Sequence, residues 1–407
     1  MNILFITNKF ITGGAERYII KKAAYLTKMG HKACVVSAGG DYTSQLKAQE
    51  IPFENVPGLD RNLNLLDSWE LLRIVAAIGI AVRKHQIDII EIDSPGVLEI
   101  GISVAYMYHL PFLLNVFHEY AFKKSQDAGL LETCAHHGCL FSLSESIMSI
   151  TSAHTGADLS KAHIHPIFID PEELDSRGDA LELAKDSFVF LAIARLTKDK
   201  AYIGVLMDEF AQFISHTGAT KTCLVVVGDG EYFKRYQQKA SKINNSIGRN
   251  DNQIVMTGSR KDITSFYRRA DVYVGMGTTV LEAAYYKKPI ILASFHPYYK
   301  ASIGYFSRMP YESVGEVIPA RVSFTPFSVM MSEVYENKKI RQDLAEEGYE
   351  KIERLYLIDA VMKKWLEEYA ELIRNKDSIL AEDITHFIYK RDNVRLKIRK
   401  FRQLLSV

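Results

Sequence analysis

A glycine-rich turn that leads into a helix is the part of this sequence best suited to bind a charged ligand. Gly275-Met276-Gly277 follows a short β-branched run and precedes a predicted helix over Thr278–Tyr286. The first amides of a helix have no acceptor within the helix, and glycines let a ligand approach them closely. We therefore predict that the amides of Gly277, Thr278 and Thr279 bind a phosphate or pyrophosphate.

An acidic residue lies about one turn into this helix. A carboxylate at Glu282 could accept hydrogen bonds from two adjacent sugar hydroxyls, as acidic residues do for the ribose of dinucleotides. Thr279 and Glu282 also have the spacing of a capping box, in which Glu282 would only hydrogen-bond to the start of its own helix. The four residues from Thr279 to Glu282 leave both interpretations open.

The stretch from Ile254 to Ser294 resembles the donor-nucleotide half of GT-B glycosyltransferases of the retaining family 4 type. Gly275-Met276-Gly277 occupies the place of a Gly-Phe-Gly motif, and Leu281-Glu282-Ala283-Ala284 matches the conserved segment after it. The resemblance implies a nucleotide-sugar donor whose ribose is held by Glu282. It departs at Val274, where the family has a first glutamate near the hydroxyls of the donor sugar, so the identity of the sugar stays open.

Two cations follow the first strand of the second predicted domain. Arg195 and Lys200 come after the buried run Phe188–Ile193. Cations in a loop are solvated by default, but a guanidinium offers a phosphate two parallel donors and an ammonium offers a point charge. The spacing resembles the family's GRL…KG motif, with alanines in place of both glycines. The resemblance implies that Arg195 and Lys200 hold the diphosphate.

Two further turns follow strands of the same domain. Gly228-Asp229-Gly230 is a predicted tight turn after Leu224–Val227, and Thr257-Gly258 closes the run Ile254–Met256. In the resembled family, main-chain groups at the second turn cradle the nucleobase. The implied donor-binding set is therefore Gly14, Arg195, Lys200, Gly228, Thr257, Gly258, Gly275, Gly277, Thr278, Thr279 and Glu282.

The first half of the chain begins with a strand, a glycine-containing loop and a helix. The strand is Ile3–Ile6, the loop ends in Gly13-Gly14-Ala15-Glu16-Arg17, and the helix is predicted from Glu16 to Met29. This order is typical of Rossmann-like domains, although two adjacent glycines are a weak signal alone. The loop also resembles the N-terminal signature of the same family, which implies that it lies near the donor phosphates and the acceptor.

A histidine stands at the end of a later strand. His118 and Glu119 follow the predicted strand Leu113–Phe117, and ligands gather at the carboxyl ends of parallel strands. A single histidine there is more often structural, but its place matches the family's histidine beside the donor sugar. The resemblance implies retention of configuration. Because Val274 replaces an acid, an inverting reaction with His118, Glu119 or Glu16 as the base also stays open.

Length and composition indicate two ordinary globular domains. The chain has 407 residues, 47% of them hydrophobic and 24% charged. The net charge of +1 gives no reason to expect nucleic acid as a partner. Four cysteines and a first segment without the apolar core of a signal peptide lead us to expect a cytoplasmic protein, peripheral at most to the inner face of the membrane.

No metal or cofactor is expected beside the nucleotide-sugar substrate. No Asp-x-Asp pair follows a strand, and Cys134-Ala135-His136-His137-Gly138-Cys139 lacks the second ligand pair that a zinc site in this arrangement needs. We interpret that segment as a helix end that leads into a strand.

Two other segments bear on partners. Residues 389–407 hold seven basic residues and one acid, with apolar residues on one helical face, which fits an anionic membrane, a partner protein or this protein's own first domain. In the predicted helix 65–84, Trp69, Leu72, Ala76 and Ile80 recur at about four-residue spacing, and we expect them to face the core.

We predict an α/β fold of two Rossmann-like domains that face a cleft, the GT-B fold. Residues 1–172 would form the acceptor-side domain, 187–360 the nucleotide-sugar domain, 361–388 a helical crossover and 389–407 a basic tail. The predicted activity is transfer of a sugar, preferably from a UDP-sugar, to a glycan or lipid-linked acceptor in cell-surface polysaccharide or glycoconjugate synthesis. An epimerase or hydrolase of the same fold, or an inactive scaffold, are the alternatives.

Overall fold

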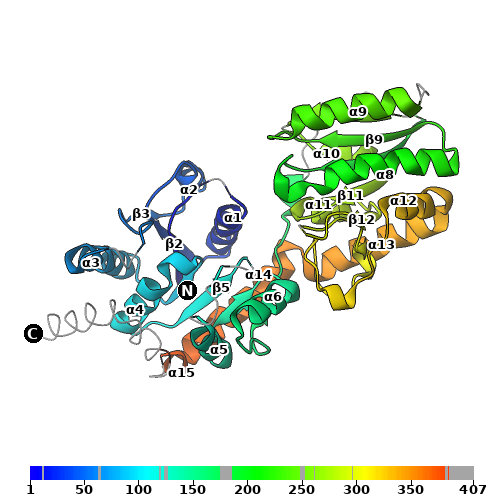
Figure 1. Ribbon diagram of the computed structural model, residues 1–407. Coiled ribbons are helices and arrows are strands. Elements are labelled where there is room, and N and C mark those ends of the chain that lie inside the picture. Colours follow the sequence, from blue (N-terminus) through cyan, green and yellow to red (C-terminus); the bar gives the residue numbers. More distant parts are fainter. Residues whose placement is uncertain are drawn as a thin grey trace, which may run out of the picture. The chain divides into compact units, whose positions relative to one another are not determined.

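The computed structural model describes residues 1–11, 13–62, 66–118, 121–122, 127–174, 186–247, 253–260, 262–295, 297–380 and 384. The chain forms two compact units (Figure 1). The first comprises Met1–His165 and Met362–Val407, and the second comprises Pro166–Val361. Glu119 and the basic tail 389–407 lie outside the described residues, so the predictions made for them stay predictions.

The first unit is built on a seven-stranded parallel sheet in the order β3-β2-β1-β4-β5-β6-β7. Its strands read as near-continuous apolar runs, because helices cover both faces of a parallel sheet. The strands are β1 (Asn2–Ile6), β2 (Lys32–Ser37), β3 (Phe53–Asn55), β4 (Ile89–Ile92), β5 (Phe112–Val116), β6 (Leu140–Ser142) and β7 (His163–Ile164).

The helices of the first unit come from both ends of the chain. They are α1 (Gly14–Lys28), α2 (Thr43–Ala48), α3 (Ser68–Lys84), α4 (Leu98–Tyr108), α5 (Ala128–His136), α6 (Glu145–Thr155), most of α14 (Ile358–Arg374) and α15 (Lys376–Ile379).

The second unit has a six-stranded sheet in the order β10-β9-β8-β11-β12-β13, parallel except for β13. Its strands are β8 (Phe188–Ile193), β9 (Thr222–Val227), β10 (Gln253–Gly258), β11 (Val272–Gly275), β12 (Ile290–Leu292) and β13 (Gly304–Tyr305). Its helices are α7 (Pro171–Leu174), α8 (Tyr202–Thr217), α9 (Phe233–Ile247), α10 (Thr264–Arg269), α11 (Thr278–Tyr285), α12 (Phe327–Glu336) and α13 (Lys338–Leu355).

Two apolar clusters cover the two faces of this second sheet. Residues of α8, α9 and α12 contribute to one cluster, and residues of α10, α11 and α13 contribute to the other. The predicted α/β class with two Rossmann-like units is thus confirmed, and the strand predicted over Phe188–Ile193 has those bounds.

The prediction for the core face of α3 is wrong. Trp69 is 73% exposed and Ile80 is 58% exposed, whereas Leu71, Ile74 and Ile78 are buried. Almost every position of this helix after Glu70 is apolar, so several helical stripes were compatible with the sequence, and packing in the folded unit selects one. An exposed apolar stripe is left on the opposite side.

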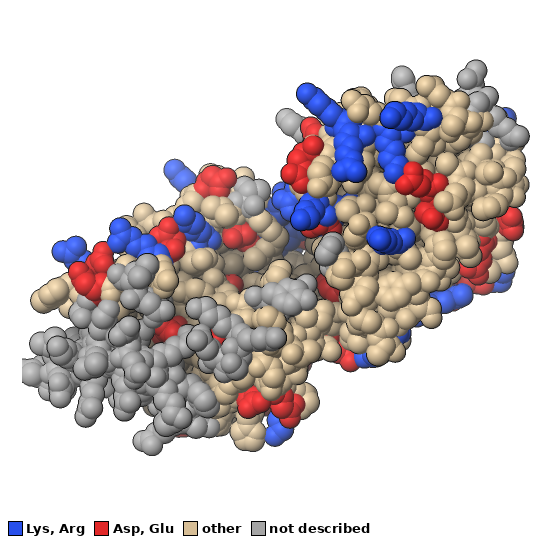
Figure 2. Space-filling view, viewed as in Figure 1, with Lys and Arg blue, Asp and Glu red and all other residues tan. Residues whose placement is uncertain are grey.

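Charged side chains of both signs are interspersed on the face shown in Figure 2, as the net charge of +1 suggests. Within the described residues, no helix combines the length and the apolar character needed to cross a bilayer.

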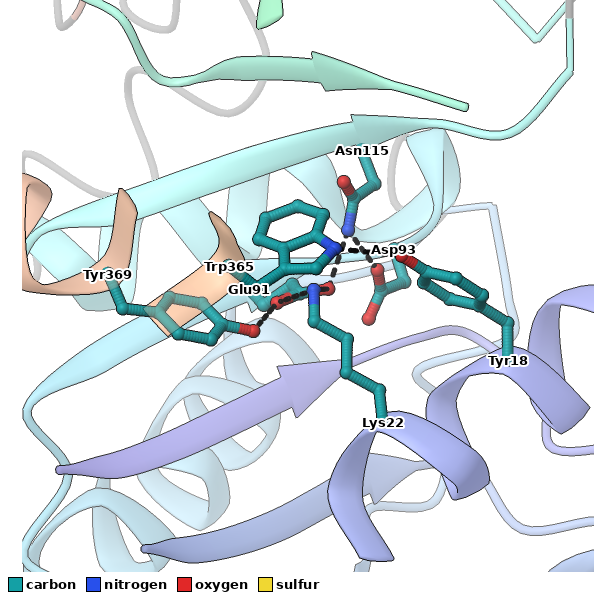
Figure 3. Close-up of polar contacts among 7 residues, drawn as sticks. All are labelled: Tyr18, Lys22, Glu91, Asp93, Asn115, Trp365 and Tyr369. Atoms are coloured by element: carbon teal, nitrogen blue, oxygen red, sulfur yellow. Dashed lines mark hydrogen bonds and ion pairs between the residues drawn. The ribbon is translucent and has the colours of Figure 1, made fainter. Parts of the chain in front are cut away.

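A buried ion pair between α1 and β4 is contacted by α14, which it ties to the sheet of the first unit (Figure 3). Lys22 Nζ of α1 lies 2.9 and 3.0 Å from the two carboxylate oxygens of Glu91 on β4, and 3.0 Å from the ring centroid of Trp365 on α14. The hydroxyl of Tyr369 on α14 donates a hydrogen bond to the same carboxylate. Burial lowers the pKa of Lys22 to about 8 against the opposing effect of Glu91, so the ammonium stays charged at neutral pH.

Replacement of Lys22 by Met should destabilise the first unit by about 3 kcal/mol, because it leaves the Glu91 carboxylate buried without its counter-charge. The free energy of unfolding in urea measures the effect. The double variant Lys22→Met/Glu91→Gln should recover most of the loss, because it removes both charges and keeps an acceptor at position 91. Equal destabilisation of the single and double variants would contradict this account.

Candidate functional site

Four loops of the second unit meet at one edge of its sheet. The strands β10, β9, β8 and β11 are neighbours and run parallel, so the segments after their carboxyl ends lie side by side. The last residues of these strands and the segments after them include Thr257-Gly258, Gly228, Arg195 with Lys200, and Gly275–Thr279. The topology therefore brings the predicted donor-binding residues of this unit to a common edge.

The helix α11 begins without a side-chain cap. Its N-cap is Gly277, with a φ of 80°, a conformation that favours glycine. The turn before it is tight, since a Cβ on Gly275 would lie 2.7 Å from the Tyr273 ring. Thr278 and Thr279 are the first helical residues, and the amides of such residues have no acceptor within a helix. These two amides and the positive end of the helix dipole form the anion-binding feature of the site.

The amide of Gly277 is not part of that feature, contrary to the sequence-based expectation. It donates a hydrogen bond to the carbonyl oxygen of Val314. This acceptor lies far along the chain, so the local motif could not reveal it.

The capping-box interpretation of Glu282 is wrong. Gly277, and not Thr279, is the N-cap, and the Thr279 hydroxyl instead donates to the carbonyl oxygen of Met276 at 3.2 Å. Glu282 accepts a hydrogen bond of 2.7 Å from the hydroxyl of Tyr267 on α10. Tyr267 therefore holds the carboxylate in place. A carboxylate has several acceptor positions, so Glu282 can hydrogen-bond to more than one donor.

Lys200 lies beside the start of α11. A Cβ on Gly277 would be 3.9 Å from Lys200 Nζ, and the ammonium also lies 4.2 Å from the ring centroid of Phe295. Burial lowers the pKa of Lys200 to about 8, although the charges of Asp199 and Glu316 oppose this shift. A partly desolvated cation next to a helix N-terminus attracts an anion more strongly than either group alone.

Two glycines fix the loop that carries Arg195. Gly228 has a φ of 141°, and a Cβ there would lie 1.9 Å from the carbonyl oxygen of Ala194. Gly230 packs in the same way on Leu196, and the Leu196 amide donates to the carbonyl of Asp229. Gly228 also donates its amide to the carbonyl of Gly258, which links this turn to β10. Arg195 itself is exposed at the site edge.

The predicted residues of the first unit lie after the carboxyl ends of β1 and β5. Gly14 is the first residue of α1 and has free space around it, whereas a Cβ on Gly13 would lie 2.3 Å from the carboxylate of Glu16. Burial raises the pKa of Glu16 above its ordinary value. His118 is exposed just after β5. The structure leaves the catalytic roles of these residues as predictions.

Sequence reasoning missed a buried acid in the first unit. Asp93 follows β4 directly, and one of its carboxylate oxygens accepts 2.7 Å from the Asn115 amide (Figure 3). The other oxygen is buried without a hydrogen-bond partner among the described residues. Burial and the charge of Glu91 raise the pKa of Asp93 well above its ordinary value. Its position at the end of an apolar strand was the only available signal.

One group in the first unit has ligand types that a metal ion could use. The ligand atoms of His163, His165 and Glu368 lie within 4.8 Å of one another. Both imidazoles contact the same Glu368 oxygen, at 3.0 and 3.3 Å. A nitrogen that donates its proton to a carboxylate cannot bind a metal at the same time, so these contacts explain the group as a bridge between β7 and α14.

Comparisons with known proteins agree with this architecture. Residues 12–173 match the model of Glycosyltransferase Family 4, and residues 178–351 match that of Glycosyl transferases group 1. An uncharacterized glycosyltransferase of Methanocaldococcus jannaschii is 30% identical over 113 residues, an alignment that spans 26% of this chain and 26% of that protein.

Solved structures show the same fold at low sequence identity. A glycosyltransferase from Rickettsia africae superposes with a TM-score of 0.68 at 16% identity, covering 92% of this chain and 99% of that one. HepE from Anabaena, in complex with UDP, superposes with a TM-score of 0.67 at 16% identity, covering 91% of this chain and 100% of that one.

The two Rossmann-like units thus have the GT-B fold of glycosyltransferases. The two family models follow one another along the chain, and the protein belongs to the group 1 glycosyltransferases of this fold.

Substitution of Gly228 by Ala should lower the melting temperature by several degrees, because the new Cβ would collide with the Ala194 carbonyl. Gly14→Ala is the matched control, since nothing lies within 4 Å of a Cβ at that position. Thermal unfolding followed by circular dichroism measures the melting temperature of both variants. An unchanged melting temperature for Gly228→Ala would show that the loop does not depend on this glycine.

Proposed function

We propose that this protein transfers a sugar from a nucleotide-sugar, with a UDP-sugar as the first candidate, to a glycan or lipid-linked acceptor. The observation that carries the proposal is the uncapped start of α11 with Lys200 beside it. That pair of positive features suits a diphosphate, and the group at the other end of a diphosphate from the nucleoside is the sugar to be transferred.

The same groups can assist the reaction. Negative charge grows on the diphosphate as its bond to the sugar breaks, and donors already in place stabilise that charge without reorganisation. Lys200, Arg195 and the amides of Thr278 and Thr279 would supply these donors. Glu282, oriented by Tyr267, would hold the ribose hydroxyls. Because these groups can neutralise the leaving group, the proposed reaction needs no metal and no further cofactor.

The choice of uridine is supported by relatives with the same fold. HepE from Anabaena has been solved with UDP, with UDP and glucose, and with UDP-glucose. Main-chain groups at Thr257 and Gly258 would meet the base in our proposal. We further propose retention of configuration, with His118 near the donor sugar and an inverting reaction through His118, Glu119 or Glu16 as the alternative.

The exposed stripe on α3 supports an acceptor attached to lipid. Trp69 and Ile80 are both mostly exposed on the first unit, and indole side chains favour the interface of a bilayer. We propose that this stripe, with the basic segment 389–407 as a second contact, brings the protein to the inner face of the membrane. A role in cell-surface polysaccharide or glycoconjugate synthesis would follow.

An inactive scaffold is the second candidate, and one observation favours it. Val274, at the position of the family's first glutamate, is fully buried in the apolar core. A scaffold would bind the nucleotide without turnover, whereas an epimerase or hydrolase would consume the donor without any acceptor.

Arg195→Ala and Glu282→Gln should each weaken UDP binding by about tenfold, since each removes a charged hydrogen bond worth roughly 1.5 kcal/mol. Isothermal calorimetry with UDP measures this loss. Lys198→Ala is the control, because Lys198 is an exposed cation of the same loop. Equal affinities for UDP in the wild type and the three variants would contradict the proposed donor site.

Trp69→Ser/Ile80→Ser should reduce binding to vesicles of phosphatidylcholine and phosphatidylglycerol by about tenfold, because two apolar side chains no longer enter the bilayer surface. Co-sedimentation with the vesicles measures the bound fraction. Val329→Ser on α12 removes an apolar side chain of comparable exposure from the other unit and should bind like the wild type. Unchanged vesicle binding by the double variant would exclude α3 as the contact.

A further inference from the structure

The turn Ser313-Val314-Gly315-Glu316 packs directly on the glycine-rich turn before α11. The Val314 carbonyl accepts the Gly277 amide, and Gly315 has a φ of 131°. A Cβ on Gly315 would lie 2.7 Å from Met276 Cβ and 3.0 Å from the Ala293 carbonyl oxygen. The two turns therefore form one packed structure, and whatever the second turn carries lies next to the anion-binding helix start.

Hydrogen bonds within this turn hold the carboxylate of Glu316. Its Oε2 accepts 2.9 Å from the Val314 amide and 3.2 Å from the Ser313 hydroxyl. The Glu316 carbonyl accepts from the hydroxyls of Ser313 and Tyr311, at 2.8 and 3.2 Å. Glu316 is thus a positioned acid on a rigid turn, and its residue is only partly buried.

The charge of Glu316 also reaches the donor site. It is one of two carboxylates that oppose the fall in the pKa of Lys200, the cation beside Gly277. A carboxylate so near a diphosphate would repel it, so phosphate binding does not explain its place there. Its chemistry fits a neighbouring group that donates hydrogen bonds, such as the hydroxyls of a sugar.

The residue directly before the glycine-rich turn, Val274, is not an acid. The side chain of Val274, on β11, is buried among apolar residues of the core. Val274 therefore offers nothing to a ligand, whereas the turn 313–316 packs against the glycine-rich turn and carries the partly exposed acid Glu316.

We propose that Glu316 hydrogen-bonds to hydroxyls of the donor sugar and thereby sets which nucleotide-sugar is accepted. The proposal rests on the nucleotide-sugar function proposed above. It makes Glu316 a sugar contact and leaves nucleotide and diphosphate recognition to Arg195, Lys200, α11 and Glu282.

Glu316→Gln separates the sugar contact from diphosphate binding. Gln keeps an oxygen that can accept from the Val314 amide, so the turn should persist. At pH 7 the variant should bind UDP as well as the wild type or more tightly, because a nearby negative charge has gone. It should bind the UDP-sugar about tenfold more weakly, because one strong acceptor for its hydroxyls has gone.

The experiment is calorimetry with UDP and with UDP-glucose, UDP-galactose and UDP-N-acetylglucosamine, on the wild type, Glu316→Gln and Glu312→Gln. Glu312 is a partly buried acid of the same segment and serves as the control. Unchanged or tighter binding of UDP together with weaker binding of the best-bound UDP-sugar, a pattern absent in Glu312→Gln, supports the sugar contact. Equal effects on both ligands would reduce Glu316 to a structural residue and overturn the proposal. Failure of the wild type to bind any of these ligands would overturn the proposed function and this inference with it.

Discussion

The second unit depends on one electrostatic arrangement, a helix start with no side-chain cap next to a partly desolvated lysine. Two positive features brought so close repel one another, and the proposed anionic ligand would offset that repulsion. The geometry of this arrangement requires glycine at several surrounding positions. Gly275 and Gly277 make the turn possible, and Gly228 lets the loop of Arg195 approach the same edge. The proposed diphosphate site would thus account for glycines that are far apart in the chain.

The first unit handles a buried lysine in the opposite way. Lys22 has a carboxylate at 2.9 Å and an indole face at 3.0 Å, so its charge is satisfied within the fold. In the part of the chain that the structure describes, no carboxylate lies within ion-pair distance of Lys200, which has only more distant acids around it. The satisfied cation Lys22 fastens α14 to the sheet, whereas Lys200 has the binding role in our proposal.

Local patterns predicted the strands and the glycine-rich turns well, because β-branched runs and glycines at strand ends act over a few residues. The start of α11 and the strand Phe188–Ile193 are examples. Long-range contacts were beyond such reasoning. The hydrogen bond from Gly277 to Val314 and the one from Tyr267 to Glu282 each join segments that are separate in the chain. The place of Glu316 beside the glycine-rich turn also depends on such a long-range contact. The exposed face of α3 was missed because nearly every residue there is apolar, so periodicity could not select the buried side.

The protonation of Lys200 tests the central claim most directly. Its pKa of about 8 leaves it partly deprotonated at pH 8, and a bound diphosphate should restore the proton. Calorimetry of UDP binding at pH 8 in two buffers of different ionisation enthalpy would then show uptake of a fraction of a proton, which Lys200→Arg should abolish because arginine stays charged. UDP binding whose enthalpy does not depend on the buffer would contradict the placement of the diphosphate beside Lys200.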